Sequence, residues 1–393
     1  MRDGPPMEIG RVRGPLALLI PSYRGGGAEG ATVRLANELA SRGLAVDLVT
    51  LSSEGPWRAQ LRPEVRPICL RTRKASTSIP KLAGYLRARA PEVFVSNMFH
   101  LNVASVVAHR MTASGALLIL VEQNELGAKL RESGAVKRVL MRQAVRWAYP
   151  HAHRVAGISQ GVADGMARVL AWNAGRISVL PNGIPIEQIR EQAAQPVDLL
   201  WFDGSGPPVV VATGRLVPQK GFDDLLRAFS LLIKATPARL LILGEGPQRG
   251  DLEQLAGRLG VECLVDLHGF VENPYALMAR AGAFALSSHY EGQGIVLLEA
   301  LACGAGVVAT DCPSGPREIL LDNEYGLLVP VGDPESMATA LRRVLTDTAL
   351  ARKLRDAAPG RAAVFSVVAA ADRLLEVVQE LRRLSSVGRA RPA

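Results

Sequence analysis

Short apolar runs alternate along the chain with segments in which apolar residues recur every three or four positions. Residues 16–20 form the first run, residues 32–42 carry apolar side chains at helical spacing, and residues 46–51 form a second run. The alternation continues with strands at 93–97, 116–121, 154–158 and 177–180, and with helices at 79–90 and 136–149. This order predicts a parallel sheet that helices cover on both faces.

A second series of the same kind follows residues 191–207, which lack periodic apolar positions. Its strands are expected at 209–213, 239–243, 264–268, 283–287 and 306–310, and its helices at 221–235, 248–259, 274–280, 294–303 and 334–346. The sequence therefore predicts an α/β protein with two doubly wound, Rossmann-like domains that face a cleft. The expected limits are a disordered tail at 1–14, domains at 15–190 and 208–363, a linker at 191–207, and a C-terminal helix and tail at 364–393 that crosses back to the first domain.

The composition is typical of a soluble globular protein. Hydrophobic residues make up 48% and charged residues 21% of the 393 positions, which excludes extensive disorder. No apolar run approaches the ~18 residues that cross a bilayer, and residues 16–20 are too short for the apolar core of a signal peptide. The four cysteines form no C-x-x-C pair, so we expect free thiols in a reducing, cytoplasmic compartment.

The charge is unevenly distributed. Residues 1–190 hold 26 Lys/Arg and 13 Asp/Glu, a net charge of +13, whereas residues 191–393 hold 20 and 24, a net charge of −4. A basic first half suits nucleic acid, anionic lipid or a phosphorylated substrate. Aromatic residues are only 5% of the chain and do not alternate with the basic ones, so we expect no nucleic-acid partner.

A glycine run, GGGAEG at 25–30, follows the first strand and includes Gly26 and Gly27. Glycine lets a backbone approach a ligand closely, and a helix N-terminus attracts phosphate. The spacing G-x-G-x-x-G also suggests an NAD-linked oxidoreductase, but residues 21–24 separate the glycines from the strand, and Asp47 lies inside the second strand rather than at its end. A loop that faces a phosphorylated ligand is favoured over a dinucleotide site and over a flexible turn.

Two cations follow the first strand of the second domain. Gly214 and Arg215 end that strand, and Lys220 stands just before the next helix. Two cations five residues apart on one loop can converge on a diphosphate, Arg as a fork and Lys as a point charge. A solvated loop with two surface charges is the alternative, and this segment alone does not decide between them.

Two glutamates flank the start of a later helix, in the segment EGQGIVLLE at 291–299. Glu291 lies on the loop, Gly294, Ile295 and Val296 open the helix, and Glu299 lies about a turn and a half into it. A carboxylate among apolar residues is costly unless something binds it, and a ribose diol is a suitable partner. The helix N-terminus between the glutamates can hold phosphate. The alternative is a structural glutamate that caps a neighbour.

One further strand end carries Gly244 and Glu245 in the segment GEGP, which is compatible with either a ligand contact or a simple turn. Several catalytic motifs are missing from the sequence. It contains no Asp-x-Asp, no phosphate-binding G-x-x-x-x-G-K-[ST] loop and no G-x-S-x-G hydrolase elbow. These absences argue against P-loop and serine-hydrolase chemistry.

Taken together, the motifs resemble family 4 glycosyltransferases of the GT-B fold. They are the glycine run, LPNGI at 180–184, GRLVPQK at 214–220, GEGP at 244–247, HGF at 268–270 and the E-x7-E pair at 291–299. Each is weak alone, but six in order are specific, and the resemblance covers nearly the whole chain. The segment DCPSGPREIL at 311–320 resembles bacterial members that build exopolysaccharide or lipid-linked oligosaccharide.

The resemblance implies a retaining hexosyl or N-acetylhexosaminyl transferase. Its donor would be a UDP- or GDP-linked sugar, and its acceptor a hydroxyl of a glycan or lipid-linked saccharide on the first domain. No metal or other cofactor is implied. By the same resemblance, Arg215 and Lys220 hold the diphosphate, Glu299 holds the ribose, Glu291 touches the donor sugar, and Gly27 borders the pyrophosphate.

The chain departs from the family in two places. Many members carry a histidine near the donor sugar where this chain has Gln123, between Glu122 and Asn124. Glutamine cannot change charge, so a proton or cation role is not expected there. The flanking Glu122 and Asn124 are candidates for sugar hydroxyls, and His100 is a candidate substitute for the histidine. Gly30 also stands where arginine is common, which removes one phosphate cation.

The basic first half suggests a membrane partner. In the segment 136–149, Arg138, Arg142 and Arg146 recur every four residues and form a basic stripe, which suits the anionic inner face of a membrane. An ordinary surface helix is the alternative. Other readings of the whole chain are a different GT-B enzyme, such as an epimerase or a phosphorylase, and a sugar-nucleotide-binding module without activity.

Overall fold

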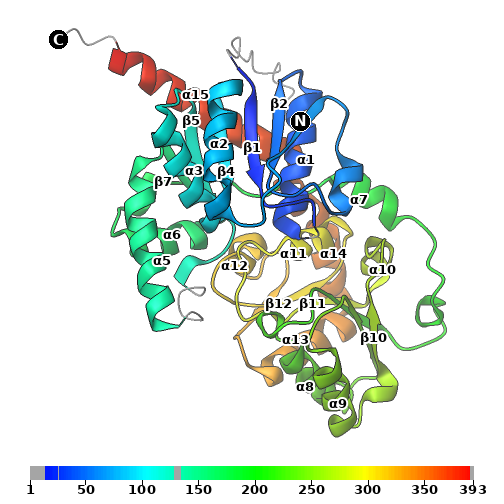
Figure 1. The fold of residues 1–393 in the computed structure, drawn as a ribbon. Helices are drawn as coiled ribbons and strands as arrows, with labels where there is room; N and C mark the ends of the chain where they lie inside the picture. Colours follow the sequence, from blue (N-terminus) through cyan, green and yellow to red (C-terminus); the bar gives the residue numbers. More distant parts are fainter. Residues whose placement is uncertain (1–13, 25, 128–133, 390–393) are drawn as a thin grey trace.

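The computed structural model describes residues 14–24, 26–127 and 134–389. The tail expected at 1–14 lies outside these residues except for Gly14. The chain builds two parallel sheets in two halves, which lie one above the other in Figure 1.

Within the described residues, the first sheet has seven parallel strands in the order β3-β2-β1-β4-β5-β6-β7. They are β1 (Leu16–Ile20), β2 (Val46–Thr50), β3 (Val65–Cys69), β4 (Val93–Asn97), β5 (Leu117–Glu122), β6 (Arg154–Gly157) and β7 (Ile177–Val179). Every residue of β1, β2, β4 and β5 is buried. Burial on both faces explains why these strands are continuous apolar runs rather than alternating patterns.

The second sheet of the described chain has six strands in the order β10-β9-β8-β11-β12-β13. They are β8 (Val209–Thr213), β9 (Arg239–Leu243), β10 (Val265–Gly269), β11 (Ala283–Leu286), β12 (Val307–Thr310) and β13 (Leu327–Val329). All its strand pairs are parallel. The prediction of two Rossmann-like α/β domains is confirmed.

Helices pack against both sheets. Those of the first half are α1 (Gly27–Ser41), α2 (Ala75–Arg89), α3 (Phe99–Thr112), α5 (Ala135–Ala148) and α6 (Gln160–Leu170). Those of the second half are α8 (Phe222–Leu232), α9 (Arg249–Leu259), α10 (Tyr275–Arg280), α11 (Ile295–Ala302), α12 (Pro316–Leu320), α13 (Pro334–Thr346) and α14 (Thr348–Ala363). α7 (Ile186–Ala193) leads from the first half to the second, and α15 (Val367–Arg389) ends the described chain.

Some elements differ from the sequence expectation for identifiable reasons. α1 begins at Gly27 rather than at 32, because Gly26 is extended and caps a helix that the glycines allow to start early. β3 was not expected, since it is an edge strand with Pro67 inside it and two exposed residues. α7 occupies the start of the linker expected at 191–207, because Ile186 and Ile189 bury its apolar face.

The C-terminal helix returns to the first half, as the sequence analysis predicted. The chain crosses beside the earlier connection, where Ile184 N donates to Phe365 O at 2.9 Å and Val367 N donates to Ile184 O at 3.0 Å. α15 then packs on α1 and buries a row of apolar side chains in the core of the first half, namely Leu374, Leu375, Val377, Val378 and Leu381. It lies behind the first sheet in Figure 1, drawn in red.

Candidate active site

The two sheets present the predicted motifs at equivalent places. β1 lies between β2 and β4, and β8 lies between β9 and β11, so each sheet reverses its strand order beside its first strand. Loops diverge at such a point and leave a crevice at the carboxyl edge, where α/β proteins bind ligands. The glycine run follows β1, and the loop that carries Lys220 follows β8.

Lys220 and Glu291 form an ion pair at this edge. Lys220 Nζ donates to Glu291 Oε1 at 2.6 Å, and Ser288 Oγ donates to the same oxygen at 2.7 Å. Glu291 is only 6% exposed. The residue Gly214 lies against the lysine stem, since a Cβ there would stand 3.3 Å from Lys220 Cε. The structure therefore joins two residues that the sequence placed on separate loops.

Two glycines hold these loops in conformations that other residues resist. Gly244 has a φ of +139°, and a Cβ there would stand 2.0 Å from Gly214 O, so any side chain would collide with the neighbouring loop. Gly294 has a φ of +87° and caps α11. This left-handed turn places Ile295 and Val296 in the first turn of α11, where their N–H groups have no partner within the helix.

Glu299 lies one turn into α11 and is partly buried. Tyr275, at the start of α10, donates its hydroxyl to Glu299 Oε1 at 3.2 Å. Burial raises the pKa of Glu299, while the nearby charge of Arg34 and the Tyr275 hydrogen bond act in the opposite direction. The carboxylate thus bonds Tyr275 of the second half and lies within the electrostatic influence of Arg34 of the first.

The first half touches the second along this edge. A Cβ on Gly27 would stand 3.0 Å from Ile295 Cδ1, and one on Gly292 would stand 2.1 Å from Gln123 O. Ser159 Oγ donates to Gly292 O at 2.7 Å. The loop that carries Glu291 and the start of α11 are therefore packed against the carboxyl edge of the first sheet, and the lower end of α1 lies beside α11 in Figure 1.

Two known protein families match the chain, one in each half. The family described as "Glycosyl transferase 4-like domain" matches residues 26–183, and the one described as "Glycosyl transferases group 1" matches residues 202–361. The first match includes residues 26–30 of the glycine run, and the second includes both Lys220 and Glu299. The chain belongs to the family 4 glycosyltransferases of the GT-B fold.

Two curated relatives of this chain are named as bacterial glycosyltransferases. One is the N-acetylgalactosamine-N,N'-diacetylbacillosaminyl-diphospho-undecaprenol 4-alpha-N-acetylgalactosaminyltransferase of Campylobacter jejuni, 35% identical over 56% of this chain and 58% of its own length. Another is the lipopolysaccharide core biosynthesis glycosyltransferase LpsE of Rhizobium meliloti, 36% identical over 51% of this chain and 55% of its own. The chain thus spans little more than half the length of each.

The solved structure of Anabaena Alr3699/HepE in complex with UDP has the same fold. The two superpose with a TM-score of 0.78 over 93% of this chain and 100% of the other, at 20% sequence identity. This agreement extends the GT-B fold to both domains of the glycosyltransferase.

The residues expected near the donor sugar lie in different environments. Gln123 is buried, donates to Asn97 Oδ1 at 2.9 Å and accepts from Asn182 Nδ2 at 2.8 Å, so it connects β4, β5 and the LPNGI segment. Glu122 is buried as well, and its Oε1 accepts from the Tyr149 hydroxyl and from Asn102 Nδ2 inside the first domain. Its carboxylate therefore joins β5 to α3 and to the segment that directly follows α5.

The two other candidates of the first domain are exposed. Asn124 follows β5 with its side chain in solvent, and His100 lies in the first turn of α3. The role of His100 as a substitute for the family's histidine stays a prediction.

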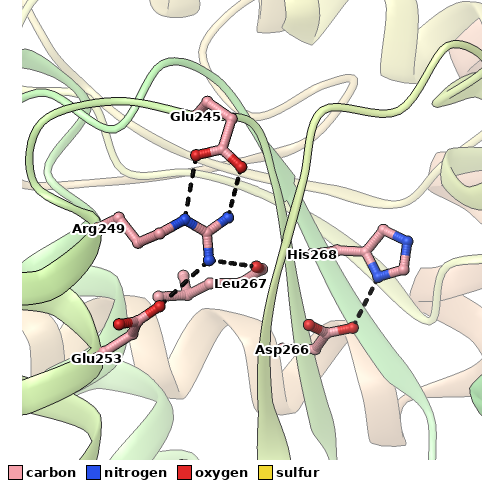
Figure 2. Close-up of polar contacts among 6 residues, drawn as sticks. All are labelled: Glu245, Arg249, Glu253, Asp266, Leu267 and His268. Carbon is pink, nitrogen blue, oxygen red and sulfur yellow. Dashed lines mark hydrogen bonds and ion pairs between the residues drawn. The ribbon is translucent and has the colours of Figure 1, made fainter.

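Arg215 and Glu245, the other predicted site residues of the second domain, lie near different charged groups. Arg215 is exposed after β8, and its charge acts on Glu29 of α1, whose pKa burial raises and Arg215 lowers. Glu245, in contrast, pairs with Arg249, the first residue of α9, through bonds of 2.7 and 3.1 Å (Figure 2). The same guanidinium bonds Glu253 and Leu267 O, so the structure places the Glu245 side chain on an exposed ion-pair network.

A cluster that sequence reasoning missed lies next to Lys220. Asp223, Asp224 and His289 have ligand atoms within 4.8 Å of one another, and His289 Nε2 lies 2.9 Å from Asp224 Oδ2. It is the one such group of three among the residues the structure describes. The sequence signal was weak, because the histidine comes 65 residues after its carboxylate partner. The expectation of a metal-free site stays a prediction.

Proposed function

We propose that this glycosyltransferase is a retaining enzyme that moves a sugar from a UDP- or GDP-linked donor to a hydroxyl of a growing glycan or lipid-linked saccharide. The observation that carries the proposal is the ion pair of Lys220 with the buried Glu291 beside the start of α11, with Glu299 one turn farther on. The cation and the N–H groups at the start of α11 suit the phosphates of a nucleotide, and the carboxylate that follows them suits its ribose.

The chemistry follows from where charge develops. The bond between the sugar C1 and the diphosphate oxygen breaks, and the leaving nucleoside diphosphate takes the electron pair and gains negative charge. The acceptor hydroxyl oxygen forms the new bond to C1 on the same face of the sugar, and its proton passes to the leaving diphosphate. Lys220, Arg215 and the N–H groups at the start of α11 would stabilise that charge, because fixed dipoles and cations need no reorganisation during the reaction. Glu291, held by Lys220 and Ser288, would accept hydrogen bonds from hydroxyl groups of the donor sugar.

A panel of nucleotide sugars tests this proposal. We expect release of nucleoside diphosphate from one UDP- or GDP-linked sugar when a saccharide acceptor is present, and we expect turnover to survive excess chelator because cations of the protein replace a metal. A coupled assay for released nucleotide measures both. Stabilisation by NAD alone in a thermal-shift panel would favour the oxidoreductase instead. Loss of turnover with chelator, restored by Mg²⁺ or Mn²⁺, would contradict the metal-free site and direct attention to Asp223, Asp224 and His289.

We further propose that the enzyme docks on an anionic membrane surface through α5. No helix among the described residues combines the length and the apolar character that a bilayer crossing demands. α5 lies at the outer side of the first domain (Figure 1) and exposes an apolar stripe, Val136 at 75%, Leu140 at 64% and Trp147 at 48%. The basic stripe of Arg138, Arg142 and Arg146 runs beside it and is exposed too.

An apolar stripe beside a basic one is the pattern of a helix that lies in a membrane interface. Each Lys or Arg near an anionic surface contributes ~1 kcal/mol of attraction, and the buried Met141 and Val145 keep the opposite face of α5 on the protein. Docking at the cytoplasmic face would bring the first domain to a lipid-linked acceptor.

Liposome flotation tests the docking. We expect the protein to float with anionic vesicles at low salt, to release at high salt, and to bind at least tenfold less after Arg138, Arg142 and Arg146 are changed to Glu, given ~1 kcal/mol per charge. Changing the exposed Arg342, Arg352 and Lys353 of the second domain to Glu alters net charge equally and should leave flotation unchanged. Equal binding to neutral and anionic vesicles would contradict docking by charge.

A further inference from the structure

An aromatic ring covers the first turn of α1, next to the glycine run. Trp57 lies in η1 (Pro56–Gln60), which follows β2, and its indole lies over Gly30. A Cβ added at Gly30 would stand 2.5 Å from Trp57 Cζ2. The arginine that is common at this position in the family therefore has no room here while the ring is in place.

Arg34, one turn farther along α1, stacks on the same indole. Its guanidinium carbon lies 5.2 Å from the ring centroid of Trp57, which is a cation–π distance. Its Nε has no hydrogen-bond partner among the described residues. The stack thus fixes the direction of the guanidinium without occupying its donors.

The geometry of α1 directs this guanidinium toward α11. Gly27, seven residues before Arg34, contacts Ile295, and Glu299 follows Ile295 by four residues. Helical side chains lean toward the helix N-terminus, and the indole on which Arg34 stacks covers Gly30, one turn from Gly27. The guanidinium therefore lies toward the end of α1 that meets α11.

Glu299 faces three other ionisable side chains: Arg34 from α1, Tyr275 from α10 and Cys303 from the end of its own helix. Burial raises the pKa of Glu299, and Arg34 is the largest influence in the opposite direction. Burial also raises the pKa of Tyr275, and raises that of Cys303 to about 12, so both groups stay protonated at neutral and acidic pH. Arg34 is the cation that favours the ionised carboxylate.

We propose that Arg34 is a positioning residue of the donor site, which is held on Trp57 and keeps Glu299 ionised and directed at the ribose of the nucleotide. This inference rests on the proposed function, because it takes the ribose as the ligand of Glu299. Arg34 belongs to the first domain and Glu299 to the second, so the coupling operates only while the two domains are in contact. Affinity for the nucleotide then depends on domain contact as well as on the second domain.

Calorimetric titration of the full chain with UDP and with GDP tests the proposal. Arg34→Gln is expected to weaken binding of the preferred nucleotide about tenfold, the scale of coupling between adjacent charged groups. The acid limb of the binding profile should move to higher pH, because the pKa of Glu299 rises further when the cation is lost. Arg34→Lys keeps the charge and should hold the limb near its wild-type position, and it serves as the second variant if Arg34→Gln folds poorly.

A double-mutant cycle separates action through Glu299 from other roles. In a Glu299→Gln background, Arg34→Gln should cost no further affinity, since the carboxylate it acts on is gone. Arg176→Gln is the matched control, because Arg176 stacks on Trp172 at 4.5 Å but precedes β7, at the amino edge of the sheet. It should leave both the affinity and the pH profile unchanged.

Two results would overturn the inference while leaving the proposed function intact. One is wild-type affinity and pH profile in Arg34→Gln. The other is a full additional loss from Arg34→Gln in the Glu299→Gln background, which would mean that Arg34 contacts the nucleotide directly. Failure of the folded wild-type chain to bind either UDP or GDP would contradict the proposed function itself, and the inference with it.

Discussion

Replacing Lys220 with alanine is expected to reduce sugar transfer about 10²–10³-fold, the usual loss when one preorganised contact to developing charge is removed. Lys220 is the cation that contacts Glu291 in the carboxyl-edge crevice, and a leaving diphosphate there would lose its nearest point charge. The measurement is kcat from released nucleoside diphosphate, with circular dichroism to confirm the fold. Lys234→Ala, an exposed lysine just after α8, is the control and should turn over normally.

The same substitution is expected to destabilise the protein, which the experiment must separate from catalysis. Removing one partner of a buried ion pair leaves an uncompensated charge and costs ~3–5 kcal/mol. Adding Glu291→Gln to Lys220→Ala removes the orphaned carboxylate, so the melting temperature should recover while turnover stays low. Near-normal turnover in the folded Lys220→Ala variant, or its recovery in the double variant, would contradict the role of Lys220 at the diphosphate.

The architecture could be predicted from the sequence because strands that are buried on both faces of a sheet appear as continuous apolar runs. Runs such as LALLI in β1 and LLIL at 240–243 in β9 are apolar along their length, as strands covered on both faces of a parallel sheet are. The order of these runs also placed the motifs after β1 and β8, where the strand order reverses. The edge strand β3 and the helix α7 carry weaker patterns, so their existence depended on packing that the sequence does not display.

Side-chain partners in the candidate site were less predictable than its location. Glu245 follows β9, as a ligand-contacting residue would, but Arg249 lies four residues later on α9 and pairs with it. That spacing was visible in the sequence, yet nothing in it decides whether a glutamate prefers a neighbour or a ligand. Glu122 presents the harder case, because its partners Tyr149 and Asn102 come from distant elements.

Arg34 could not be recognised because the register of α1 was not known. The sequence analysis placed the start of this helix at residue 32. Gly27 would then lie in a loop, and the direction of the Arg34 side chain in the first turn of the helix could not be predicted. Once α1 starts at Gly27, the seven-residue spacing puts both on one face. A difference of five residues in one boundary therefore hid the side of α1 on which Arg34 lies.

Replacing Glu299 with alanine is expected to lower kcat/KM for the nucleotide-sugar donor about 10²-fold, because hydrogen bonds to a charged group contribute ~1.5–3 kcal/mol each. The fold should survive, since Glu299 is only partly buried and accepts a single, long hydrogen bond of 3.2 Å from the Tyr275 hydroxyl within the described residues. Glu262→Ala, an exposed glutamate of the same domain, is the control.

The identity of the group that Glu299 binds can be established with a modified donor. If the carboxylate accepts from the ribose hydroxyls, the wild-type enzyme should discriminate against a 2′,3′-dideoxy donor, and Glu299→Ala should use the two donors equally well. The pH dependence adds a second check: burial raises the pKa of Glu299, so the wild-type rate falls with acid as the carboxylate protonates, and Glu299→Ala should lose that limb. Discrimination between the donors that persists in Glu299→Ala would show that the ribose is held elsewhere and that Glu299 serves to anchor α10 on α11 through Tyr275.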